Sequence, residues 1–397
     1  MKIRDGLLSV SPQTCFQVLF PDSVQTNRSG GLTARGSRPK SLLSSSTVVQ
    51  RAKWSMETRS SPASRRVLVT GAAGFIGFHA VQRLAARGDT VTALDNFNSY
   101  YDPKLKRDRI QCLINQYPQV RIVERDLMDE QALDALFSEH KFTHVLHLAA
   151  QAGVRHSLTH PHDYLRSNCV GFLNILECIR HQQPGPPVMV YASSSSVYGL
   201  GSQVPFHESM RVDSPASLYA ATKRADELMA FTYHHLYGIH VTGLRYFTVY
   251  GPWGRPDMAY YSFAKAMQAG RPIVLYRSGS TEPARDFTFI DDAIDGTIAA
   301  LDHAYECEIF NIGNHQMEPL SALVQALEEE FGIVAQKQYG GLQPGDVPVT
   351  YADVSKAHDL LGYQPKIGLR EGIQRFAEWY RWYHHADRNR LDIGLGI

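Results

Sequence analysis

A tyrosine and a lysine four residues apart stand in the run LYAATK, which spans 218–223 and is rich in helix-favouring alanine. Side chains four residues apart are neighbours on one face of a helix, so Tyr219 and Lys223 would lie together. A nearby ammonium stabilises a phenolate, and a tyrosine in that setting can take and return a proton. The alternative is a tyrosine ring that packs on a lysine stem, and the rest of the chain has to decide between the two.

A run of hydroxyl groups precedes this pair along the chain. The segment PPVMVYASSSS, 186–196, is an apolar run that ends in serines, and it predicts a strand. A serine at the end of such a strand would lie where a ligand meets the sheet. A hydroxyl, a phenol and an ammonium together can remove a proton from a substrate hydroxyl while the serine binds the same oxygen. The combination favours the catalytic interpretation of the tyrosine and the lysine.

The elements that would position these groups begin at Arg66. The segment RVLVTGAAGFIGFHAVQRLAARG, 66–88, is an apolar run, a turn with Gly71, Gly74 and Gly77, and then apolar residues at helical spacing. Glycines let a backbone approach a pyrophosphate, and the helix N-terminus offers it free N–H groups. The next apolar run ends in Asp95, whose carboxylate can bind an adenosine ribose and would repel a 2′-phosphate. This pattern favours NAD over NADP, unless Asp95 only caps the following loop.

Strands and helices continue to alternate through the first half of the chain. Further strands are predicted within 120–127, 143–153, 186–196 and 240–247, and helices between them include 134–140 and 163–181. The alternation predicts an α/β fold, a Rossmann-type doubly wound parallel sheet with a smaller C-terminal substrate-binding α/β lobe. Ligands of such sheets bind at the carboxyl ends of the strands, where the glycine turn, Asp95, Asp126 and the serines all fall.

The composition excludes several classes of protein. The chain has 397 residues, a formal net charge of +1 and 44% hydrophobic residues, which does not indicate nucleic-acid binding or general disorder. Five cysteines are scattered without a CxxC or Cys/His cluster, so we expect no metal site, and buried thiols indicate a reducing compartment such as the cytoplasm.

Residues 1–65 differ from the rest in being rich in Ser, Thr and Arg and poor in acids. A transit peptide to an organelle, a disordered extension and an artefact of the start site, with Met56 as the true start, all fit this composition. The apolar patches in this segment are too short to span a bilayer. We predict four regions: the extension 1–65, a NAD-binding domain 66–247, a partly interleaved nucleotide-sugar lobe 248–384, and a tail 385–397.

Five motifs together identify a family. TGAAGFIG, LDNFNSYYDP, HLAAQAGVR, SSSSVYG and YAATK make the chain from about 66 to 384 resemble the extended short-chain dehydrogenase/reductases, and among them the nucleotide-sugar epimerases. The resemblance implies tightly held NAD that is recycled within one turnover. It implies Tyr219 as acid and base, Lys223 as its helper, and Ser194 or Ser196 as the hydroxyl. The cofactor ligands that it implies are Gly71, Gly74, Phe75, Ile76, Gly77, Asp95, Asn96, Asp126, Leu127, Leu148, Ala149, Ala150, Gln151, Asn168, Tyr219, Lys223, Phe247 and Val249.

The second half resembles the epimerases that act on UDP-glucuronate. The stretch LRYFTVYGPWGRPDMA, 244–259, and the YYDP element at 100–103 carry this likeness. It implies a 4-epimerisation to UDP-galacturonate through a transient 4-keto intermediate. Thr248 and Arg255 could hold the substrate carboxylate with hydrogen bonds and a guanidinium charge. The full set of implied substrate ligands is Arg155, Ser194, Ser196, Thr248, Arg255, Ile273 near uracil, Arg285 at the diphosphate, Gln343 and Asp346 at the uridine ribose.

Related reactions differ from this one in the residues before VYG. Sugar 4,6-dehydratases carry an Asp–Glu pair there and UDP-glucuronate decarboxylases a Glu, whereas this chain has Ser195 and Ser196. A UDP-glucose 4-epimerase, the decarboxylase, and more remotely a non-catalytic NAD-binding scaffold remain the alternatives. Relatives commonly form homodimers through two helices per subunit, for which 103–116 or 163–181 with 216–237 are candidates.

Overall fold

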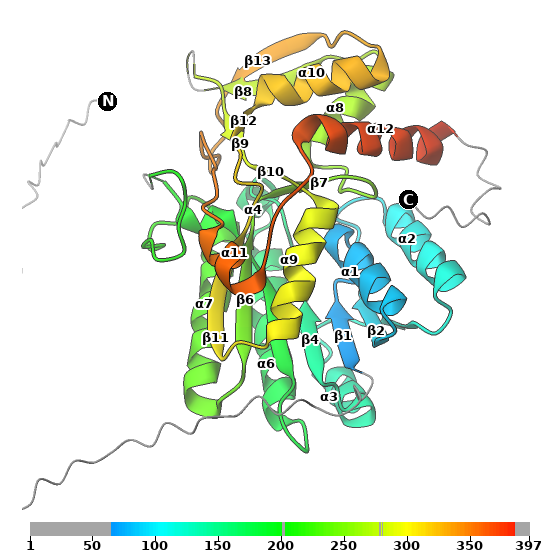
Figure 1. Cartoon of the computed structure of the whole chain (residues 1–397), viewed down its shortest axis with the longest axis vertical. Coiled ribbons are helices and arrows are strands. Elements are labelled where there is room, and N and C mark those ends of the chain that lie inside the picture. The colour runs from blue at the N-terminus through cyan, green and yellow to red at the C-terminus, as the bar shows by residue number, and fades with distance from the viewer. Residues whose placement is uncertain (1–64, 201–202, 278, 280, 386–397) are drawn as a thin grey trace, which may run out of the picture. The chain divides into compact units, whose positions relative to one another are not determined.

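A seven-stranded parallel sheet forms the centre of the protein (Figure 1), as the alternating pattern predicts. The computed structural model describes residues 65–200, 203–277, 279 and 281–385, so the predicted extension and tail lie outside the described residues. The sheet order is β11-β6-β5-β4-β1-β2-β3. The strands are β1 (Arg66–Thr70), β2 (Thr90–Asp95), β3 (Arg121–Glu124), β4 (His144–His147), β5 (Val188–Ser194), β6 (Val241–Tyr246) and β11 (Cys307–Ile312).

Helices cover both faces of this sheet. One face carries α1 (Phe75–Ala86), α2 (Pro103–Gln116) and α9 (Ile290–His303), and the other carries α3 (Glu130–His140), α6 (Gly171–His181) and α7 (Leu218–Tyr237). The central strands are covered by helices on both faces, and most of their middle residues are therefore apolar. In β1, for example, the run from Val67 to Thr70 is entirely buried. The first β-α unit also fixes the glycine turn, since it connects a fully buried strand to a helix packed on the same sheet.

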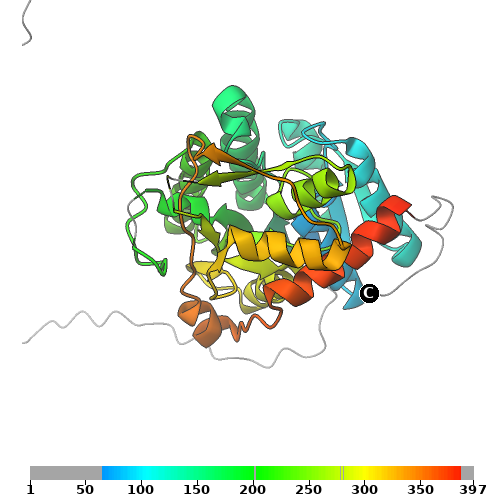
Figure 2. The same ribbon diagram turned by 90° about the horizontal axis from the view of Figure 1, so that it is seen from above.

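A smaller lobe lies at one end of the sheet (Figures 1 and 2). Its short strands pair as β8 (Ile273–Arg277) with β13 (Lys337–Gly341), β7 (Thr248–Tyr250) with β10 (Phe287–Phe289), and β9 (Ala284–Arg285) with β12 (Glu318–Pro319). Its helices are α8 (Ala259–Gln268), α10 (Leu320–Phe331), α11 (Ser355–Leu361) and α12 (Leu369–His385). Helices α10 and α12 lie side by side in the view from above (Figure 2).

The two predicted domains share elements across the boundary at residue 247. Strand β11 follows the lobe strands β7 to β10 in the chain, yet it pairs with β6 as the seventh strand of the large sheet. Helix α9 packs against α1 of the first domain. The segment 290–312 is therefore part of the nucleotide-binding layer, although it falls in the predicted lobe 248–384.

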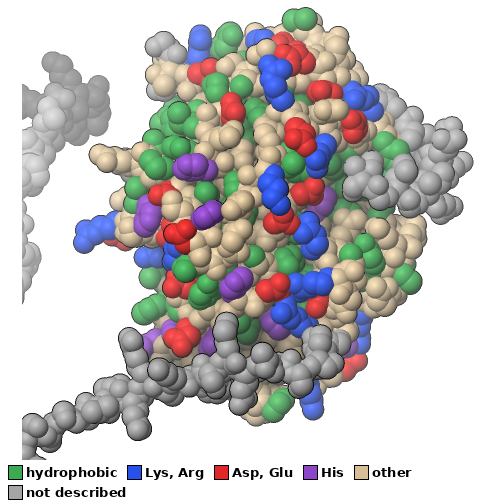
Figure 3. All heavy atoms as spheres, viewed as in Figure 1, with side chains coloured by type: hydrophobic (Ala, Val, Ile, Leu, Met, Phe, Trp, Pro, Cys, Tyr) green, Lys and Arg blue, Asp and Glu red, His purple; other side chains and the backbone are tan. Residues whose placement is uncertain are grey.

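Short helical turns connect the large elements near the carboxyl edge of the sheet. They are α4 (His156–Thr159), α5 (Pro161–Tyr164), the π-helix η1 (Leu165–Val170) and the 3-10 helix η2 (Ser195–Tyr198). No helix of the described ranges is long and apolar enough to cross a membrane. On the face shown in Figure 3, acidic and basic side chains are interspersed among the described residues. Such a mixture of signs gives that face no basic field of the kind that binds nucleic acid.

Candidate active site

A cavity of about 680 Å³ lies at the carboxyl ends of β1, β2, β4 and β5, and Arg255 and Met258 of the lobe contribute to its wall. This is the volume range and the position in which α/β folds bind ligands. Most of the predicted cofactor and catalytic residues line it. They are Gly71, Gly74, Phe75, Ile76, Gly77, Asp95, Asn96, Asp126, Leu127, Leu148, Ala149, Ala150, Gln151, Ser194, Tyr219, Lys223, Phe247, Val249 and Arg255.

The glycine turn forms a close backbone crossing that admits no side chain. Gly71 has a φ of +70°, and a Cβ on it would lie 2.7 Å from the backbone nitrogen of Ala149. A Cβ on Gly77 would lie 2.1 Å from the carbonyl oxygen of Gly71. Helix α1 begins at an N-cap glycine, Gly74, without a side-chain cap and without an acid in its first turn. Its first amides and the positive end of its dipole are therefore available to an anion in the cavity.

Asp95 has two structural hydrogen bonds in addition to its place in the cavity wall. One carboxylate oxygen accepts from the backbone N–H of Ala73 at 3.0 Å, and the other from that of Phe97 at 2.8 Å. Asp95 thus caps the following loop, as the alternative interpretation holds, and also ties that loop to the glycine turn. Each oxygen keeps a second lone pair that a ribose hydroxyl can use.

No sequence pattern indicates the role of Arg109, which is completely buried in α2. Its guanidinium donates to the carbonyl oxygens of Ala73, Trp253 and Gly254 at 2.6–3.1 Å and to the Tyr101 hydroxyl at 2.7 Å. These bonds join the glycine turn to the lobe loop that carries Arg255. A single buried side chain therefore fixes the distance between the two walls of the cavity.

Tyr219 and Lys223 line the cavity from one face of α7, as their spacing predicts. The helix begins at Ser217, whose hydroxyl accepts from the backbone N–H of Ala220 at 3.2 Å, and this cap fixes the turn on which Tyr219 stands. The Tyr219 ring packs edge-on against Tyr164, with 6.1 Å between the ring centroids. The Lys223 ammonium is 2% exposed and donates to Asp226 at 3.0 Å.

The two serine candidates differ in position. Ser194, the last residue of β5, lines the cavity, whereas Ser196 is absent from the described lining. The Ser194 hydroxyl donates to the Ser196 hydroxyl at 3.2 Å and accepts from the Ser196 backbone N–H at 3.2 Å. The geometry therefore places Ser194 at the cavity and Ser196 behind it as its hydrogen-bond partner.

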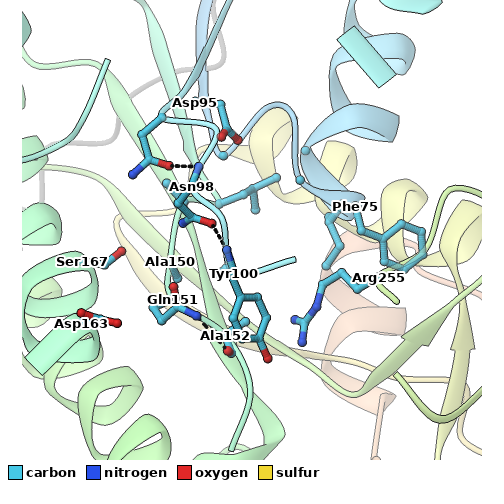
Figure 4. A pocket seen from close by; sticks show the side chains of 18 of the residues that line it. Phe75, Asp95, Asn98, Tyr100, Ala150, Gln151, Ala152, Asp163, Ser167 and Arg255 are labelled. Carbon is cyan, nitrogen blue, oxygen red and sulfur yellow. Dashed lines mark hydrogen bonds between the residues drawn. The ribbon is translucent and has the colours of Figure 1, made fainter. Parts of the chain in front are cut away.

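Arg255 and Tyr100 both extend into the cavity (Figure 4), and Asp257 joins them in a three-residue network. The Arg255 guanidinium forms a two-point ion pair with Asp257, at 3.0 and 2.5 Å, and the Tyr100 hydroxyl donates to the same carboxylate at 3.1 Å. Partial burial opposes ionisation of Asp257, but the neighbouring guanidinium outweighs it and holds the pKa of that carboxyl below its usual value. Burial, and then the Asp257 charge, raises the pKa of Tyr100 to about 12, so its hydroxyl stays a donor.

Asn168 binds a loop residue of the cavity wall, Gln151, and is not itself part of the described lining. It is 1% exposed in η1, and its side-chain amide accepts from the Gln151 backbone N–H at 2.7 Å and donates to the Gln151 carbonyl oxygen at 3.1 Å. A further bond of 3.0 Å runs to the Thr222 hydroxyl on α7. The predicted cofactor contact of Asn168 is therefore indirect in this geometry, because its amide is used to hold the loop that lines the cavity.

The predicted nucleotide-end residues lie outside the described lining of the cavity. Three of them come together from distant segments, since Arg155 pairs with Asp346 at 2.9 Å and both interact electrostatically with Arg285. The Arg285 guanidinium donates to the carbonyl oxygens of Ala284 and Pro348, both at 2.9 Å. Ile273 is buried in β8, and the Gln343 amide donates to the carbonyl oxygen of Gly341 at 3.2 Å.

Thr248 is the residue whose predicted position fits least well. Phe247 and Val249 line the cavity, and Thr248 between them does not. Successive side chains of an extended segment point to opposite sides, so these three residues cannot all face one ligand. Sequence reasoning also left Tyr100 and Asp257 without a role, although both lie in the quoted YYDP and GRPDMA stretches, because nothing local shows that these loops meet.

Comparisons with known proteins place this geometry among sugar-nucleotide enzymes. The NAD dependent epimerase/dehydratase family matches residues 67–313. UDP-glucuronate 4-epimerase 6 of Arabidopsis thaliana is 48% identical over 353 residues, which cover 84% of this chain and 76% of the relative. UDP-glucuronate 4-epimerase 4 of the same plant is 47% identical over 357 residues, covering 84% and 81%.

Solved structures give the same result. A UDP-glucuronic acid 4-epimerase from Bacillus cereus, crystallised with UDP-glucuronic acid and NAD, matches with a TM-score of 0.75 at 34% identity. The match covers 80% of this chain and 100% of that one. A UDP-glucose 4-epimerase from Thermus thermophilus, in complex with NAD, matches with a TM-score of 0.71 at 32% identity, covering 80% and 99%.

Proposed function

The chain belongs to the NAD-dependent epimerase/dehydratase family, and we propose that it is an isomerase that interconverts UDP-glucuronate and UDP-galacturonate by epimerisation at C4. The observation that carries this proposal is the cavity that holds a glycine cradle, Tyr219, Lys223 and Ser194 on one wall and Arg255 on the other. The matches to the two Arabidopsis thaliana UDP-glucuronate 4-epimerases named above each cover 84% of this chain.

The residues present fit NAD as the cofactor. The cradle of Gly71 and Gly77 has no room for a Cβ, and the uncapped N-terminus of α1 offers amides to a diphosphate. Asp95 stands at the end of β2, where its carboxylate accepts ribose hydroxyls and repels a 2′-phosphate. When bound, NAD supplies a hydride acceptor for C4 and returns the hydride, so the sugar passes through a 4-keto state.

Proton transfer at the sugar O4 is the work of the chain's own residues. Tyr219 takes the proton from O4 as the ketone forms and returns it as the alcohol is restored. Lys223, with an ammonium that is buried and fixed by α7, stabilises the phenolate. Ser194 lines the cavity, and we propose that its O–H turns from the Ser196 hydroxyl to the same substrate oxygen.

The substrate carboxylate requires a cation that keeps it out of line with the C4 ketone. A 4-keto uronate is a β-keto acid and loses CO₂ when its carboxylate aligns with the ketone π system. Arg255 uses two of its nitrogens for Asp257, and Nη1 has no hydrogen-bond partner within the described part of the chain. That nitrogen can bind the substrate carboxylate. We keep Thr248 as a further proposed donor to the substrate carboxylate. Because Thr248 does not line the cavity, this role requires a conformational change in the β7 segment.

The predicted nucleotide ligands remain proposals of the same kind. Arg155, Arg285 and Asp346 form one charged cluster, which suits a diphosphate and a ribose at the lobe end of the substrate. Ile273 and Gln343 stand near this cluster in the chain segments β8 and 342–346. Ser195 and Ser196 stand where the dehydratases carry the acid needed for dehydration and the decarboxylases carry a Glu, which argues against both alternatives and more strongly against the dehydratase.

The decisive experiment incubates the purified chain with UDP-glucuronate and no added NAD, and reads products by NMR of the anomeric protons. UDP-galacturonate is the expected product, and its formation without added cofactor shows that NAD is carried and recycled. If UDP-pentose and CO₂ form, the protein is the decarboxylase and not the epimerase. If only UDP-glucose is turned over, the proposed substrate is wrong and the protein is a UDP-glucose 4-epimerase. If protein that contains NAD turns over neither UDP-sugar, only the non-catalytic NAD-binding scaffold remains as an explanation.

A second measurement tests the carboxylate contact. Arg255→Gln should lower kcat/KM for UDP-glucuronate and raise the fraction of UDP-pentose, because the carboxylate is no longer held. Arg121→Gln, which removes a surface arginine paired with Glu139, is the matched control and should change neither. An Arg255→Gln chain with unaltered product ratio would contradict the proposed role.

We also propose a homodimer formed through α6, η1 and α7. Their exposed apolar side chains are Leu165, Val170, Leu173, Leu228, Phe231 and Leu236, of which Phe231 is 60% exposed. In α2 the apolar side chains of Leu105, Ile110 and Leu113 are buried in the fold, and Ile114 is the large apolar residue of this helix that is exposed. A second copy offers the same apolar face, and two-fold pairing is the commonest way to cover such a face. Phe231→Asp should give monomers in light scattering, and an unchanged dimer mass would exclude this interface.

We place the enzyme in a reducing compartment and favour the cytoplasm. Cys112, Cys169, Cys178 and Cys307 are free thiols in the described residues. Such thiols are typical of cytoplasmic chains. Fractionation of cells that express the tagged full chain tests the assignment against an organelle.

A further inference from the structure

Asp226 forms a buried ion pair with the lysine of the active site. It lies one helical turn after Lys223 on α7, and its Oδ2 accepts from the Lys223 ammonium at 3.0 Å. Asp226 is fully buried and Lys223 is 2% exposed. The second carboxylate oxygen, Oδ1, has no hydrogen-bond partner anywhere in the residues that the structure describes.

This arrangement is poor for stability. Burial of a charged group is costly unless the group is paired and its remaining lone pairs are satisfied. The next residue, Glu227, is a contrast, because its carboxylate binds Arg245 at 2.8 and 2.9 Å, Arg224 at 2.9 Å and Ser193 at 2.7 Å. Glu227 therefore stabilises the fold, whereas the single partner of Asp226 is a side chain of the active site.

We propose that Asp226 is a positioning residue for the 4-epimerisation, which holds the Lys223 ammonium and sets the pH range in which Tyr219 exchanges the substrate proton. The inference deepens the proposed function and rests on it. Lys223 has three N–H donors, and one is used by Asp226. The other two are left for the cavity side, where Lys223 lies in the wall beside Tyr219.

The charge of Asp226 works against the charge of Lys223. An ammonium alone stabilises a nearby phenolate, and a carboxylate on its far side reduces that effect. When Asp226 is ionised, its charge offsets part of the Lys223 charge that acts on the phenol. When Asp226 is protonated, the full ammonium charge acts on the phenol.

Asp226 changes charge in a useful range. Burial raises the pKa of this carboxyl to about 6, against the opposing effect of Lys223. The titratable groups of other elements that face the Asp226–Lys223 pair do not change their charge in this pH range. Burial raises the pKa of Cys169 on η1 to about 11 and that of Tyr191 on β5 well above its usual value. Burial lowers the pKa of His147 on β4, which faces Lys223, to about 3.

Groups on the remaining elements that pack against α7 are occupied by other partners. Burial opposes ionisation of Glu227, but Arg245 of β6 outweighs it and lowers the pKa of Glu227, which therefore stays ionised. Glu177 of α6 binds Tyr233 and Arg180, and Tyr164 of α5 donates to the carbonyl oxygens of Ala152 and Gly153. Tyr198 of η2 donates to Asn311 at 2.7 Å. His156 of α4 faces Tyr100, His160 and Asp163 rather than the pair, and burial lowers its pKa. Asp226 is thus the group beside Lys223 whose charge varies near neutral pH.

The test is the pH profile of kcat/KM for UDP-glucuronate with NAD-loaded chain. In Asp226→Asn the acidic limb should move to lower pH by on the order of one unit, since the buried negative charge that offsets the Lys223 ammonium is removed. Asp226→Glu keeps the charge and should return the limb toward the wild-type position. Asp134→Asn, which removes an exposed carboxylate from α3, is the control and should leave the limb unmoved.

A purely structural role for Asp226 predicts lower activity at every pH with the limb in place, and that result would overturn the inference. If Asp226→Asn does not fold, Asp226→Ala is used in its place, because alanine is the best helix-forming residue and buries no polar group. Should the wild-type chain turn over no UDP-sugar, the proposed function fails first. A pH titration of the Tyr219 phenolate absorbance, taken as the difference from Tyr219→Phe, then tests the inference alone. The midpoint of this titration should lie at lower pH in Asp226→Asn than in the wild-type chain, and an unchanged midpoint would show that the inference is wrong.

Discussion

His147 should make the protein sensitive to mild acid. It is the last residue of β4, lies opposite Thr70 of β1 and is 1% exposed. Its Nδ1 lies 2.9 Å from the Thr70 hydroxyl oxygen, and its ring packs edge-on against Phe172 with 5.4 Å between ring centroids. Burial, and then the charge of Lys223, lowers the pKa of His147 from 6.5 to about 3.

The sign follows from which state binds the proton. A histidine whose pKa is lowered by folding is protonated first in the unfolded chain, so its contribution to stability is complete above pH 6.5 and is lost as pH falls. Between pH 6.5 and 4 the unfolded imidazole is protonated and the folded one is neutral. At 1.36 kcal/mol per pH unit, these 2.5 units amount to about 3 kcal/mol of unfolding free energy.

The assay compares the wild-type chain with His147→Asn by urea unfolding at pH 7, 6, 5 and 4, with tryptophan fluorescence as the signal. The variant should have a lower unfolding free energy than the wild-type chain at pH 7 because packing is lost. The difference in unfolding free energy between the two chains should shrink by about 3 kcal/mol by pH 4. His181→Asn, which removes a histidine with a side chain 67% exposed, is the control. A deficit for His147→Asn that stays constant with pH, or a His147 imidazole that titrates near pH 6.5 by NMR, would refute the reasoning.

Three further substitutions probe the cavity. Gly77→Ala should release NAD on purification, seen in the ratio of absorbance at 260 and 280 nm, because its Cβ would meet the Gly71 carbonyl; Gly185→Ala, with open space around it, should keep NAD. Arg109→Met leaves three buried carbonyl oxygens without their donor and should lower the unfolding free energy by about 3 kcal/mol or more in urea. Tyr219→Phe should reduce kcat by roughly 10²–10⁴-fold while NAD stays bound, and near-normal kcat would exclude Tyr219 as acid and base.

Local sequence patterns predicted the nucleotide-binding half well. The strands that contain Val67, Val145 and Val190 are short apolar runs, and each is next in the chain to a helix with apolar residues at helical spacing. The glycine turn, Asp95, Tyr219 and Lys223 also lie within these units. Their positions depend on neighbours a few residues away in the chain and on the rule that parallel strands end at one edge. That is why the predicted doubly wound sheet agrees with the structure, and why most of the residues predicted as cofactor ligands line one cavity.

The predictions for the lobe were weaker because its contacts are long-range. Arg255 was predicted as a ligand of the substrate carboxylate, and the sequence did not indicate that the structure also pairs it with Asp257 and, through that carboxylate, with Tyr100. The placement of Thr248 outside the cavity lining depends on the direction of β7, which its pairing with β10 fixes. No local pattern indicates that β11 joins the large sheet, since it follows a long excursion through the lobe.

The sequence by itself therefore determined the sheet and the cradle for a dinucleotide, and it brought together the groups that we propose transfer the proton, because spacing along one helix or one β-α turn sets these. Tertiary structure decided the rest. Arg109 joins the glycine turn to the loop at Trp253, and Asp226 is buried against Lys223 when α7 packs on its neighbours. The physical reason is desolvation: a charged side chain gains its role only when folding removes water from it and leaves one partner within hydrogen-bond distance.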